Sequence, residues 1–341
     1  MKKVVVDIFG GDHAPDEIVK GCLIALENGK DFSIVMVGDQ QAIENCLANQ
    51  TYDANRIEIV HAPDVITNDE SPTLAIRTKK QSSLVVAYEY LKNDQDAIGL
   101  VSAGSTGAVL TGATLKVGRL SGVSRPALAP LLPTVVPDKK VMLVDCGANV
   151  DCKPHMLLQF AQMGDAFAKS VLKVENPKIG LLCNGTEDHK GNELTHQVFQ
   201  LLKESNLNFV GNMEARDILS GQYDVVVTDG FYGNIALKTC EGTALAMFSI
   251  LKKAVTSNFI RKIGASVLKP AFKEVKKVMD YNESGGAPFL GVKKLVVKAH
   301  GSSKGKAFSA CIKQIVDFDN GNLIGIMKEH FENTVVEQQN D

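Results

Sequence analysis

Apolar residues along this chain gather into short unbroken runs that alternate with longer segments of mixed polarity. The runs are rich in Val, Ile and Leu and end near Gly, Asn, Asp or Ser, which is typical of strands buried on both faces of a sheet. They cover residues 3–9, 33–38, 57–60, 97–101, 141–145, 178–183, 208–211, 223–229 and 295–298. Strands that alternate with helices predict an α/β fold with a mainly parallel sheet and helices on both faces.

The segments between the runs repeat apolar residues every three or four positions, which predicts amphipathic helices. These helices cover residues 17–26, 43–47, 73–91, 159–172 and 194–202. Arg77, Lys79 and Lys80 fall near the start of the helix predicted at 73–91, where positive charge opposes the helix dipole. Helix stability therefore does not explain these three positive charges. Either an anionic ligand or ordinary exposure at the surface explains them.

Residues 245–279 predict a long helical segment of a different kind. Its apolar stripe (Ile260, Ile263, Val267, Ala271, Val275 and Val278) is flanked by eight Lys or Arg residues, at 252, 253, 261, 262, 269, 273, 276 and 277, against only Glu274 and Asp280. Pro270 is expected to split the segment into two helices. A basic amphipathic helix fits an anionic membrane surface, a partner helix or packing on its own domain. Ile260, Ile263, Val267 and Leu268 are the predicted membrane contacts.

The loops that follow the strands carry the candidate chemistry, because ligands of parallel sheets bind at the carboxyl ends of the strands. In the loop at 102–107, Gly104 and Gly107 let the backbone approach a ligand, and Ser102, Ser105 and Thr106 supply hydroxyl groups. The N–H groups of the following helix complete a possible anion site. A tight strand–helix turn with a Ser or Thr cap fits the same residues.

Composition narrows the function further. The 341 residues are 45% hydrophobic and carry a net charge of −2, which fits a soluble globular protein and argues against nucleic acid as a partner. The seven cysteines form no C-x-x-C pair, and no apolar run reaches the length of a membrane span. Residues 1–7 lead directly into a predicted strand and do not resemble a cleavable signal, so none is expected. Neither a dinucleotide fingerprint nor a phosphate-binding P-loop follows a strand, so no nucleotide cofactor is expected. No two histidines have the spacing of helical metal ligands, so no metal is expected either.

Several of these loops resemble, in sequence and in order, the PlsX family of bacterial phosphate acyltransferases. The matching segments are 10–15 (GGDHAP), 70–77 (ESPTLAIR), 102–107 (SAGSTG), 145–149 (DCGAN), 190–193 (KGNE), 229–234 (DGFYGN), 285–291 (GGAPFLG) and 300–303 (HGSS). The chain departs from the family pattern at Ser105, where Asn is usual, and at Tyr232, where Thr is usual.

The resemblance implies a fold like that of phosphotransacetylases and isocitrate dehydrogenases, in one α/β domain over residues 1–341 with a helical excursion at 245–284. It implies transfer of a long-chain acyl group from acyl carrier protein to inorganic phosphate. The acyl-phosphate product would pass to an acyl-phosphate:glycerol-3-phosphate acyltransferase for phospholipid synthesis. It also implies a cytoplasmic homodimer that associates peripherally with the inner face of the cell membrane.

On this basis phosphate is expected at the 102–107 loop, with Lys190, Arg77 or Lys238 as its charge partner. Proton transfer is expected from His189 or His300, oriented by Asp229 or Asp12. The expected site also includes Gly10, Gly11, Ser102, Gly104, Ser105, Thr106, Gly107, Asn149 and Asn234. Two alternatives stay open, namely a short-chain phosphotransacylase that uses coenzyme A thioesters and a non-catalytic scaffold of lipid synthesis.

Overall fold

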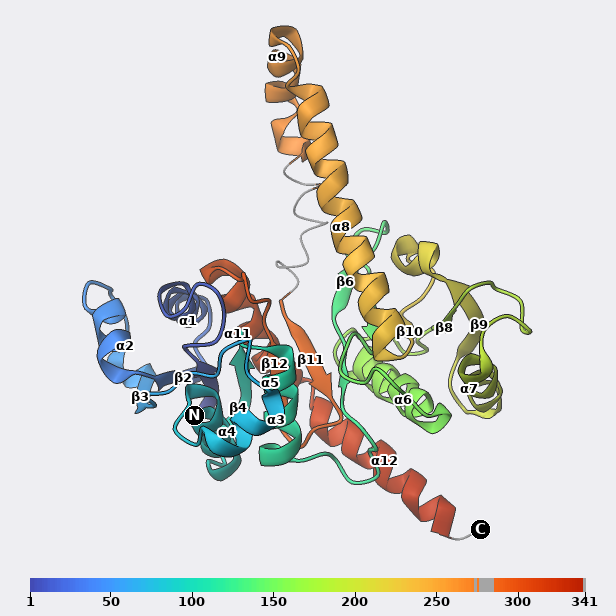
Figure 1. Ribbon diagram of the computed structural model, residues 1–341, viewed down its shortest axis with the longest axis horizontal. Coiled ribbons are helices and arrows are strands. Elements are labelled where there is room, and N and C mark those ends of the chain that lie inside the picture. Colours follow the sequence, from blue (N-terminus) through green and yellow to red (C-terminus); the bar gives the residue numbers. More distant parts are fainter. Residues whose placement is uncertain (273–274, 276–284, 340–341) are drawn as a thin grey trace.

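The computed structural model describes residues 1–272, 275 and 285–339 and shows two mostly parallel sheets with helices packed around them (Figure 1). The seven-stranded sheet has the order β3 (Ile57–His61), β2 (Phe32–Gly38), β1 (Lys2–Asp7), β4 (Ala97–Ser102), β12 (Leu295–Lys298), β11 (Ala287–Leu290) and β5 (Ala127–Leu128). The five-stranded sheet has the order β6 (Leu131–Pro133), β7 (Lys140–Val144), β10 (Val225–Val227), β8 (Ile179–Cys183) and β9 (Phe209–Glu214). Each run that was predicted to be a strand forms one.

The mainly parallel β-structure that the sequence predicts is divided between two sheets, because the chain crosses from one to the other. The Pro-rich connection contains β5 and β6, which belong to different sheets, and β11 brings the chain back beside β12. All three strands are antiparallel to a neighbour, whereas the other pairings are parallel. Such short strands give too little periodic signal to be recognised from the sequence.

Helices cover both faces of the larger sheet, which gives the expected three layers. On one face α1 (Asp16–Asn28) packs against α11 (Gly305–Asn320), and on the other α4 (Ser83–Asn93) packs against β1 and β4. The smaller sheet packs against α6 (Pro154–Ser170) and α7 (Glu193–Glu204). The middle of each central strand is fully buried, as an uninterrupted apolar run predicts.

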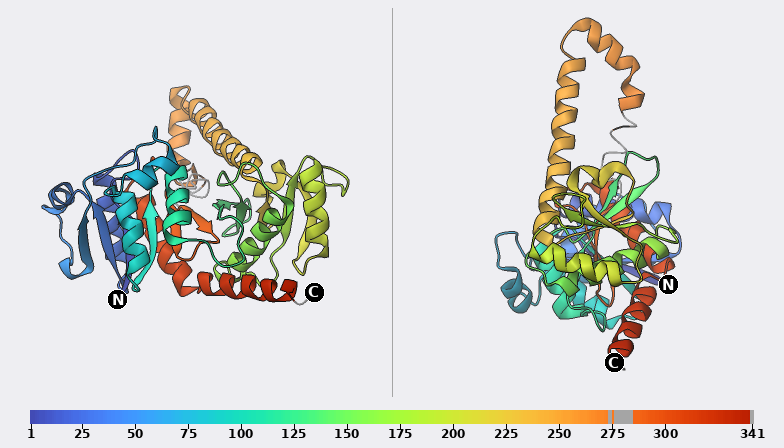
Figure 2. Two further views of the ribbon diagram at one scale, coloured as in Figure 1. Left: turned by 60° about the horizontal axis from the view of Figure 1, so that its bottom comes forward. Right: turned by 90° about the vertical axis from the view of Figure 1, so that its right-hand side faces the viewer.

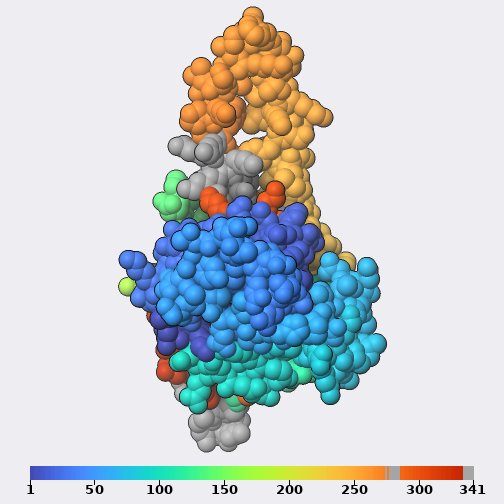
Figure 3. Space-filling view, turned by 90° about the vertical axis from the view of Figure 1, so that its left-hand side faces the viewer, coloured from blue at the N-terminus to red at the C-terminus, as the bar shows by residue number. Residues whose placement is uncertain are grey.

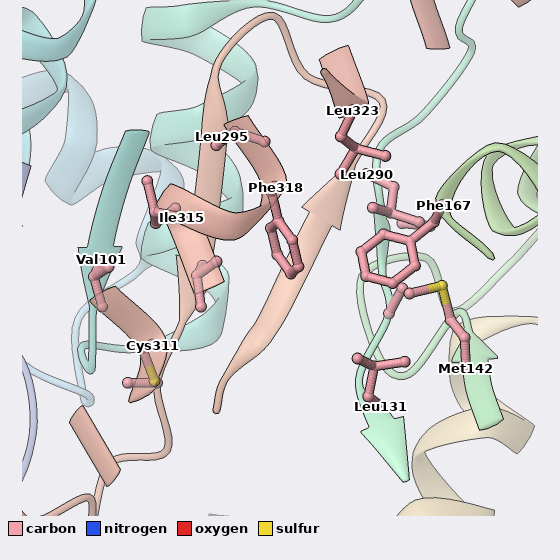
Figure 4. Packing of buried hydrophobic residues seen from close by; sticks show 14 of the residues in the cluster. Val101, Leu131, Met142, Phe167, Leu290, Leu295, Cys311, Ile315, Phe318 and Leu323 are labelled. Atoms are coloured by element: carbon pink, nitrogen blue, oxygen red, sulfur yellow. The ribbon is translucent and has the colours of Figure 1, made fainter. Parts of the chain in front are cut away.

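One apolar core joins the two sheets (Figure 4). Phe318 of α11 meets Phe167 of α6 edge to face, with ring centroids 5.1 Å apart. The last helix, α12 (Leu323–Gln339), runs beneath both halves, and its Leu323, Met327 and Phe331 are buried in the same core (Figure 2). This packing fixes the carboxyl ends of the two sets of strands relative to one another.

The helix predicted at 73–91 is two helices, α3 (Pro72–Thr78) and α4, separated by a turn at 79–82. The Ser82 hydroxyl accepts from the Val85 N–H and starts the second helix. Arg77 therefore lies in the last turn of α3, where positive charge favours the helix dipole, and the expectation that it opposes the dipole was wrong. Lys79 donates to Glu70 at 2.8 Å and to the Val65 carbonyl at 2.9 Å.

The long helical segment begins earlier than predicted and projects from the body of the protein (Figures 1 and 3). Helix α8 spans Gly230–Val255, and α9 spans Phe259–Val267 at its far end. Helical residues resume at Lys269, so the expected break beside Pro270 is confirmed, but the break at 256–258 was not predicted. Lys273, Glu274, Lys276, Lys277, Val278 and Asp280 lie outside the described residues.

The far end of this projection is strongly apolar. Phe259, Ile260, Ile263, Val267 and Leu268 expose 77%, 81%, 53%, 75% and 53% of their surfaces. Within the part of the chain that the structure describes, no helix is long and apolar enough to cross a membrane. The exposed fractions of these five residues place the apolar surface of α9 on the outside of the protein.

Candidate active site

Three neighbouring parallel strands place Asp7, Ser102 and Lys298 side by side at their carboxyl ends. Asp7 of β1 pairs in register with Ser102 of β4, and Lys298 of β12 pairs with Ser102 from the other side. The loops that follow these strands therefore begin at the same edge of the sheet. The candidate site is built around this row.

Ser102 holds the root of the 102–107 loop. Its hydroxyl donates to Asp7 Oδ2 at 2.7 Å and accepts from the Gly104 N–H at 3.0 Å. Both Asp7 and Ser102 are buried, and burial raises the pKa of the Asp7 carboxyl, opposed chiefly by the hydrogen bond from Ser102. Because the hydroxyl proton of Ser102 is already engaged, Ser102 shapes the loop.

Two glycines after β1 allow the three loops to lie in contact. A Cβ on Gly10 would stand 2.6 Å from Asp7 Oδ2 and 2.7 Å from the Gly104 nitrogen, so a larger residue would displace the loop. Gly11 has φ +103° and lies against Ala103. The N–H of Asp12 donates to the Gly301 carbonyl at 2.9 Å, which joins the first loop to the third.

Beyond buried Ala103, the residues of the 102–107 loop are partly exposed. Ser105 precedes α5 (Thr106–Gly112) and makes no side-chain cap to it, so the capped-turn interpretation does not describe this residue. A Cβ on Gly107 would stand 2.7 Å from Pro72 Cγ, which shows that the start of α3 packs here. Arg77 lies at the exposed far end of that helix.

Lys298 is a central residue of the site that sequence reasoning missed. Its ammonium group donates to the Ala299 carbonyl and to the Ala103 carbonyl, the latter at 3.4 Å. Burial lowers the pKa of Lys298 to about 8, opposed by Cys311 and Asp12 and assisted by the positive charge of Lys238. The available signal was a lysine that ends the otherwise apolar strand at 295–298.

His300 lies two residues beyond Lys298 and faces the same group of charges. Its Nδ1 accepts from the Ser302 N–H at 3.2 Å, so the neutral ring carries its proton on Nε2. Partial burial lowers the pKa of His300, and Lys238 and Lys298 lower it further, while Glu241 and Asp12 raise it. Four of the expected or newly found site residues, Asp12, Lys238, Lys298 and His300, are thus brought together.

Helix α8 supplies the opposite wall, although residues 229–234 were expected to lie in a loop. Asp229 is its N-cap and accepts from the Tyr232 N–H at 2.8 Å, and burial raises the pKa of this carboxyl. Asn234 lies near Gly147, since a Cβ added to Gly147 would stand 3.7 Å from the Asn234 side chain. Lys238 pairs with Glu241 at 2.7 Å.

The loop at 145–149 anchors the start of α8. The Asn149 side chain holds the loop in place. Its Nδ2 donates to Asp145 Oδ2 at 2.9 Å and to the carbonyl of Pro126, outside the loop, at 2.8 Å. The Gly230 N–H donates to the Asn149 carbonyl at 2.7 Å. A Cβ on Gly233 would stand 1.9 Å from the Asp145 carbonyl oxygen, so α8 lies directly on this loop.

His189 and Lys190 lie elsewhere, in the loop that follows β8 in the smaller sheet. The His189 carbonyl is 3.0 Å from His196 Nε2, and Lys190 packs over Gly185, whose Cβ would stand 2.8 Å from Lys190 Cγ. Neither residue is among the groups that most affect the pKa of Lys298 or of His300. In the described part of the chain, no three His, Cys, Asp or Glu side chains are placed to hold a metal ion.

Comparison with known proteins finds matches that cover nearly the whole chain. The model of a family described as "Fatty acid synthesis protein" matches residues 2–325. The phosphate acyltransferase of Clostridium novyi is 48% identical over 98% of this chain and 100% of its own length. The phosphate acyltransferase of Bacillus licheniformis is 48% identical over 96% of this chain and 97% of its own length.

Solved structures agree with the fold. A phosphotransacetylase from Streptococcus pyogenes superposes with a TM-score of 0.64 over 95% of this chain and 94% of its own, at 15% identity. A 4-hydroxythreonine-4-phosphate dehydrogenase from Klebsiella pneumoniae superposes with a TM-score of 0.54 over 92% of this chain and 98% of its own, at 12% identity. These structures confirm the expected fold class.

Proposed function

Because the chain belongs to the PlsX family of phosphate acyltransferases, enzymes that transfer an acyl group to phosphate, we propose that its donor is a long-chain acyl group on acyl carrier protein. The acyl-phosphate product then serves an acyl-phosphate:glycerol-3-phosphate acyltransferase of phospholipid synthesis. The observation that carries the site assignment is the cluster of Lys298, Lys238 and His300 beside the 102–107 loop.

Phosphate binds in this proposal between that loop and the two lysines. Gly104 keeps the loop backbone open to close approach, and Ser105 leaves the first N–H groups of α5 without a side-chain cap. Lys298 and Lys238 supply positive charge, and Asp12 is the nearby carboxylate that offsets part of it. Of the three expected charge partners, Lys190, Arg77 and Lys238, this proposal keeps Lys238 and adds Lys298, which was not among them.

Hydrogen phosphate then attacks the thioester directly, because a bound nucleophile needs positioning rather than a covalent intermediate. A phosphate oxygen forms a bond to the carbonyl carbon, the carbon–sulfur bond breaks, and the phosphate proton passes to the sulfur. His300 donates its Nε2–H to the carbonyl oxygen on which negative charge develops. The lowered pKa of His300 keeps it neutral near pH 7, so it acts as a hydrogen-bond donor in this proposal.

A donor panel tests the substrate. Palmitoyl-acyl carrier protein, palmitoyl-coenzyme A and acetyl-coenzyme A are each incubated with the full chain, with and without phosphate, and products are identified. The proposal expects acyl-phosphate from the carrier-protein donor. Activity confined to acetyl-coenzyme A supports a short-chain phosphotransacylase, and binding without phosphate-dependent thioester loss supports a scaffold.

We also propose that the protein is a homodimer at the inner face of the cytoplasmic membrane. The exposed apolar residues of α9 support membrane contact, together with Arg261 and Lys262 on the same helix. The exposed apolar surface of α8 outside the cavity described below, including Leu245 and Ile250, supports contact with a second subunit. The two surfaces are separate along the projection, so substitutions can distinguish them.

A further inference from the structure

A cavity of about 720 Å³ lies on the side of α8 that faces away from the charge cluster. It is bordered by the end of β8, the 3₁₀ helix at Ala215–Ser220 and one face of α8, and it opens to solvent. Its apolar lining includes Leu182, Ile218, Leu219, Ile235, Ala236 and Met247. In Figure 1, α8 stands between the elements that form this cavity and those that carry the three loops.

We propose that this cavity holds the acyl chain of the substrate. The inference rests on the proposed function, and it adds a binding site for a long saturated chain, separate from the phosphate site. The occupant is identified by the charge, the hydrogen bonding and the size of the cavity, and by its distance from the reacting groups.

Charge and hydrogen bonding at the cavity favour an apolar occupant. Arg216 is the charged residue among its described lining, and it is paired with Glu214. Asn192 Oδ1 accepts from the Thr195 N–H at 3.0 Å, and the Thr195 hydroxyl donates to the Asn192 carbonyl at 3.0 Å, so these polar groups are satisfied within the protein. Burial raises the pKa of Cys240, which keeps its thiol neutral. Asn184, Thr239 and Thr243 also line the cavity, but most of its exposed wall is apolar, so an anionic or sugar ligand would find few partners here.

The size of the cavity also favours a long chain. Pockets that enclose whole drug-sized ligands span about 300–1,000 Å³, and this cavity lies within that range. An acetyl group or a phosphate ion would leave most of its apolar wall unfilled. A chain of many methylene groups would cover that wall.

The two faces of α8 connect the cavity to the reaction. Asn234, Lys238 and Glu241 follow one another at helical spacing on the face toward the three loops. Ala236 and Met247 lie on the opposite face, about one helix diameter away, on the order of 10 Å. Ile235 lies between the two faces, and Tyr232 lies one turn before Ala236 near the start of the helix. Both line the cavity and are about half exposed, so the chain passes over them.

Filling the cavity tests the proposal. Ala244→Phe and Thr239→Phe place an aromatic ring at lining positions, and Ala246→Phe is the matched control on the same helix, outside the lining. Binding of the fluorescent C18 fatty acid cis-parinaric acid is measured for each full-length variant. Both filled variants should bind at least tenfold more weakly than the wild type, and the control should bind as the wild type does.

Acyl-donor kinetics provide the second measurement. In the wild type, kcat/KM should rise with chain length from C8 to C16, by up to about fourfold per methylene. In the filled variants the rise should flatten, with an unchanged KM for phosphate. Wild-type chain preference and fatty-acid binding in both filled variants would overturn the proposal.

Two further outcomes distinguish this inference from a dimer contact at the cavity and from failure of the proposed function. If filling the cavity converts a dimer to a monomer in sedimentation while chain preference persists, a second copy covers the cavity and the proposal is wrong. If no thioester reacts in any variant, the proposed function fails, and the fatty-acid binding comparison still decides what the cavity binds.

Discussion

Lys298 of β12 lies in register beside Ser102 of β4, so a partly buried ammonium group stands next to the residue that anchors the 102–107 loop. Ser102 is fixed by buried Asp7 on its other side. The row of three side chains explains why loops after β1, β4 and β12 form one site. It also makes Lys298 the residue whose loss should damage phosphate binding most.

Replacement of Lys298 by Met should lower kcat/KM for phosphate by about 10²–10³-fold, because it removes a fixed positive charge from a partly desolvated site. Steady-state kinetics at varied phosphate checks this. Lys293→Met, an exposed lysine that precedes the same strand, is the control and should retain wild-type kinetics. Equal rates for Lys298→Met and wild type would remove Lys298 from the site.

The KM for phosphate should rise as pH increases through about 8. The ammonium form of Lys298 binds the anion, and its pKa is lowered to about 8 by burial, so the binding form is lost above that value. Lys298→Arg keeps its charge in this range and should show no such rise. A pH profile that is identical for both proteins would contradict the assignment.

Replacement of His300 by Asn should lower kcat by about 10²-fold, because the Nε2–H donor at the developing oxyanion is lost. His189→Asn is the comparison, since His189 lies in the loop after β8, and it should keep kcat near the wild-type value. Single-turnover acyl transfer measures both. A larger loss of kcat in His189→Asn than in His300→Asn would place the reaction at the loop after β8 of the smaller sheet.

Replacement by alanine should change the free energy of unfolding in opposite directions at Gly233 and Gly242 of α8. Gly233→Ala places a Cβ 1.9 Å from the Asp145 carbonyl and should cost at least about 1–3 kcal/mol of unfolding free energy through overpacking. Gly242→Ala meets nothing within 4 Å and should stabilise the protein by up to about 1 kcal/mol through helix propensity. Denaturant unfolding of the two variants decides between these signs.

Ile260→Glu and Val267→Glu should weaken co-sedimentation with vesicles that contain anionic lipid by at least tenfold, because each puts a charge on an exposed apolar surface. Ser266→Glu adds the same charge at a polar position of α9 and should have a smaller effect. Unchanged binding of both apolar-site variants would remove the lipid role of α9.

The sequence predicted the strands well because fully buried strands appear as unbroken apolar runs. It missed the start of α8 because Gly230 and Gly233 are typical of loops, whereas here they allow the helix to lie on Asn149 and Asp145. It misplaced Arg77 because a turn at 79–82 interrupts an otherwise helical pattern. These outcomes depend on tertiary contacts that periodicity does not contain.

The site was predicted in part for the same reason. The glycine-rich loops were visible, and strand order brings those after β1, β4 and β12 together. The order of the strands was not visible, so His189 and Lys190 could not be separated from His300 and Lys238. Lys298 was overlooked because a lysine at a strand end is ordinary until its burial is known.

The most direct test of the account is incorporation of radiolabelled inorganic phosphate into acyl-phosphate from palmitoyl-acyl carrier protein, by wild type and by Lys298→Met. We expect labelled acyl-phosphate in amounts equal to the thiol released by the wild type, and at least a hundredfold slower formation in the variant. Thiol release by the wild type without labelled product, or equal rates in the two proteins, would contradict acyl transfer to phosphate at this site.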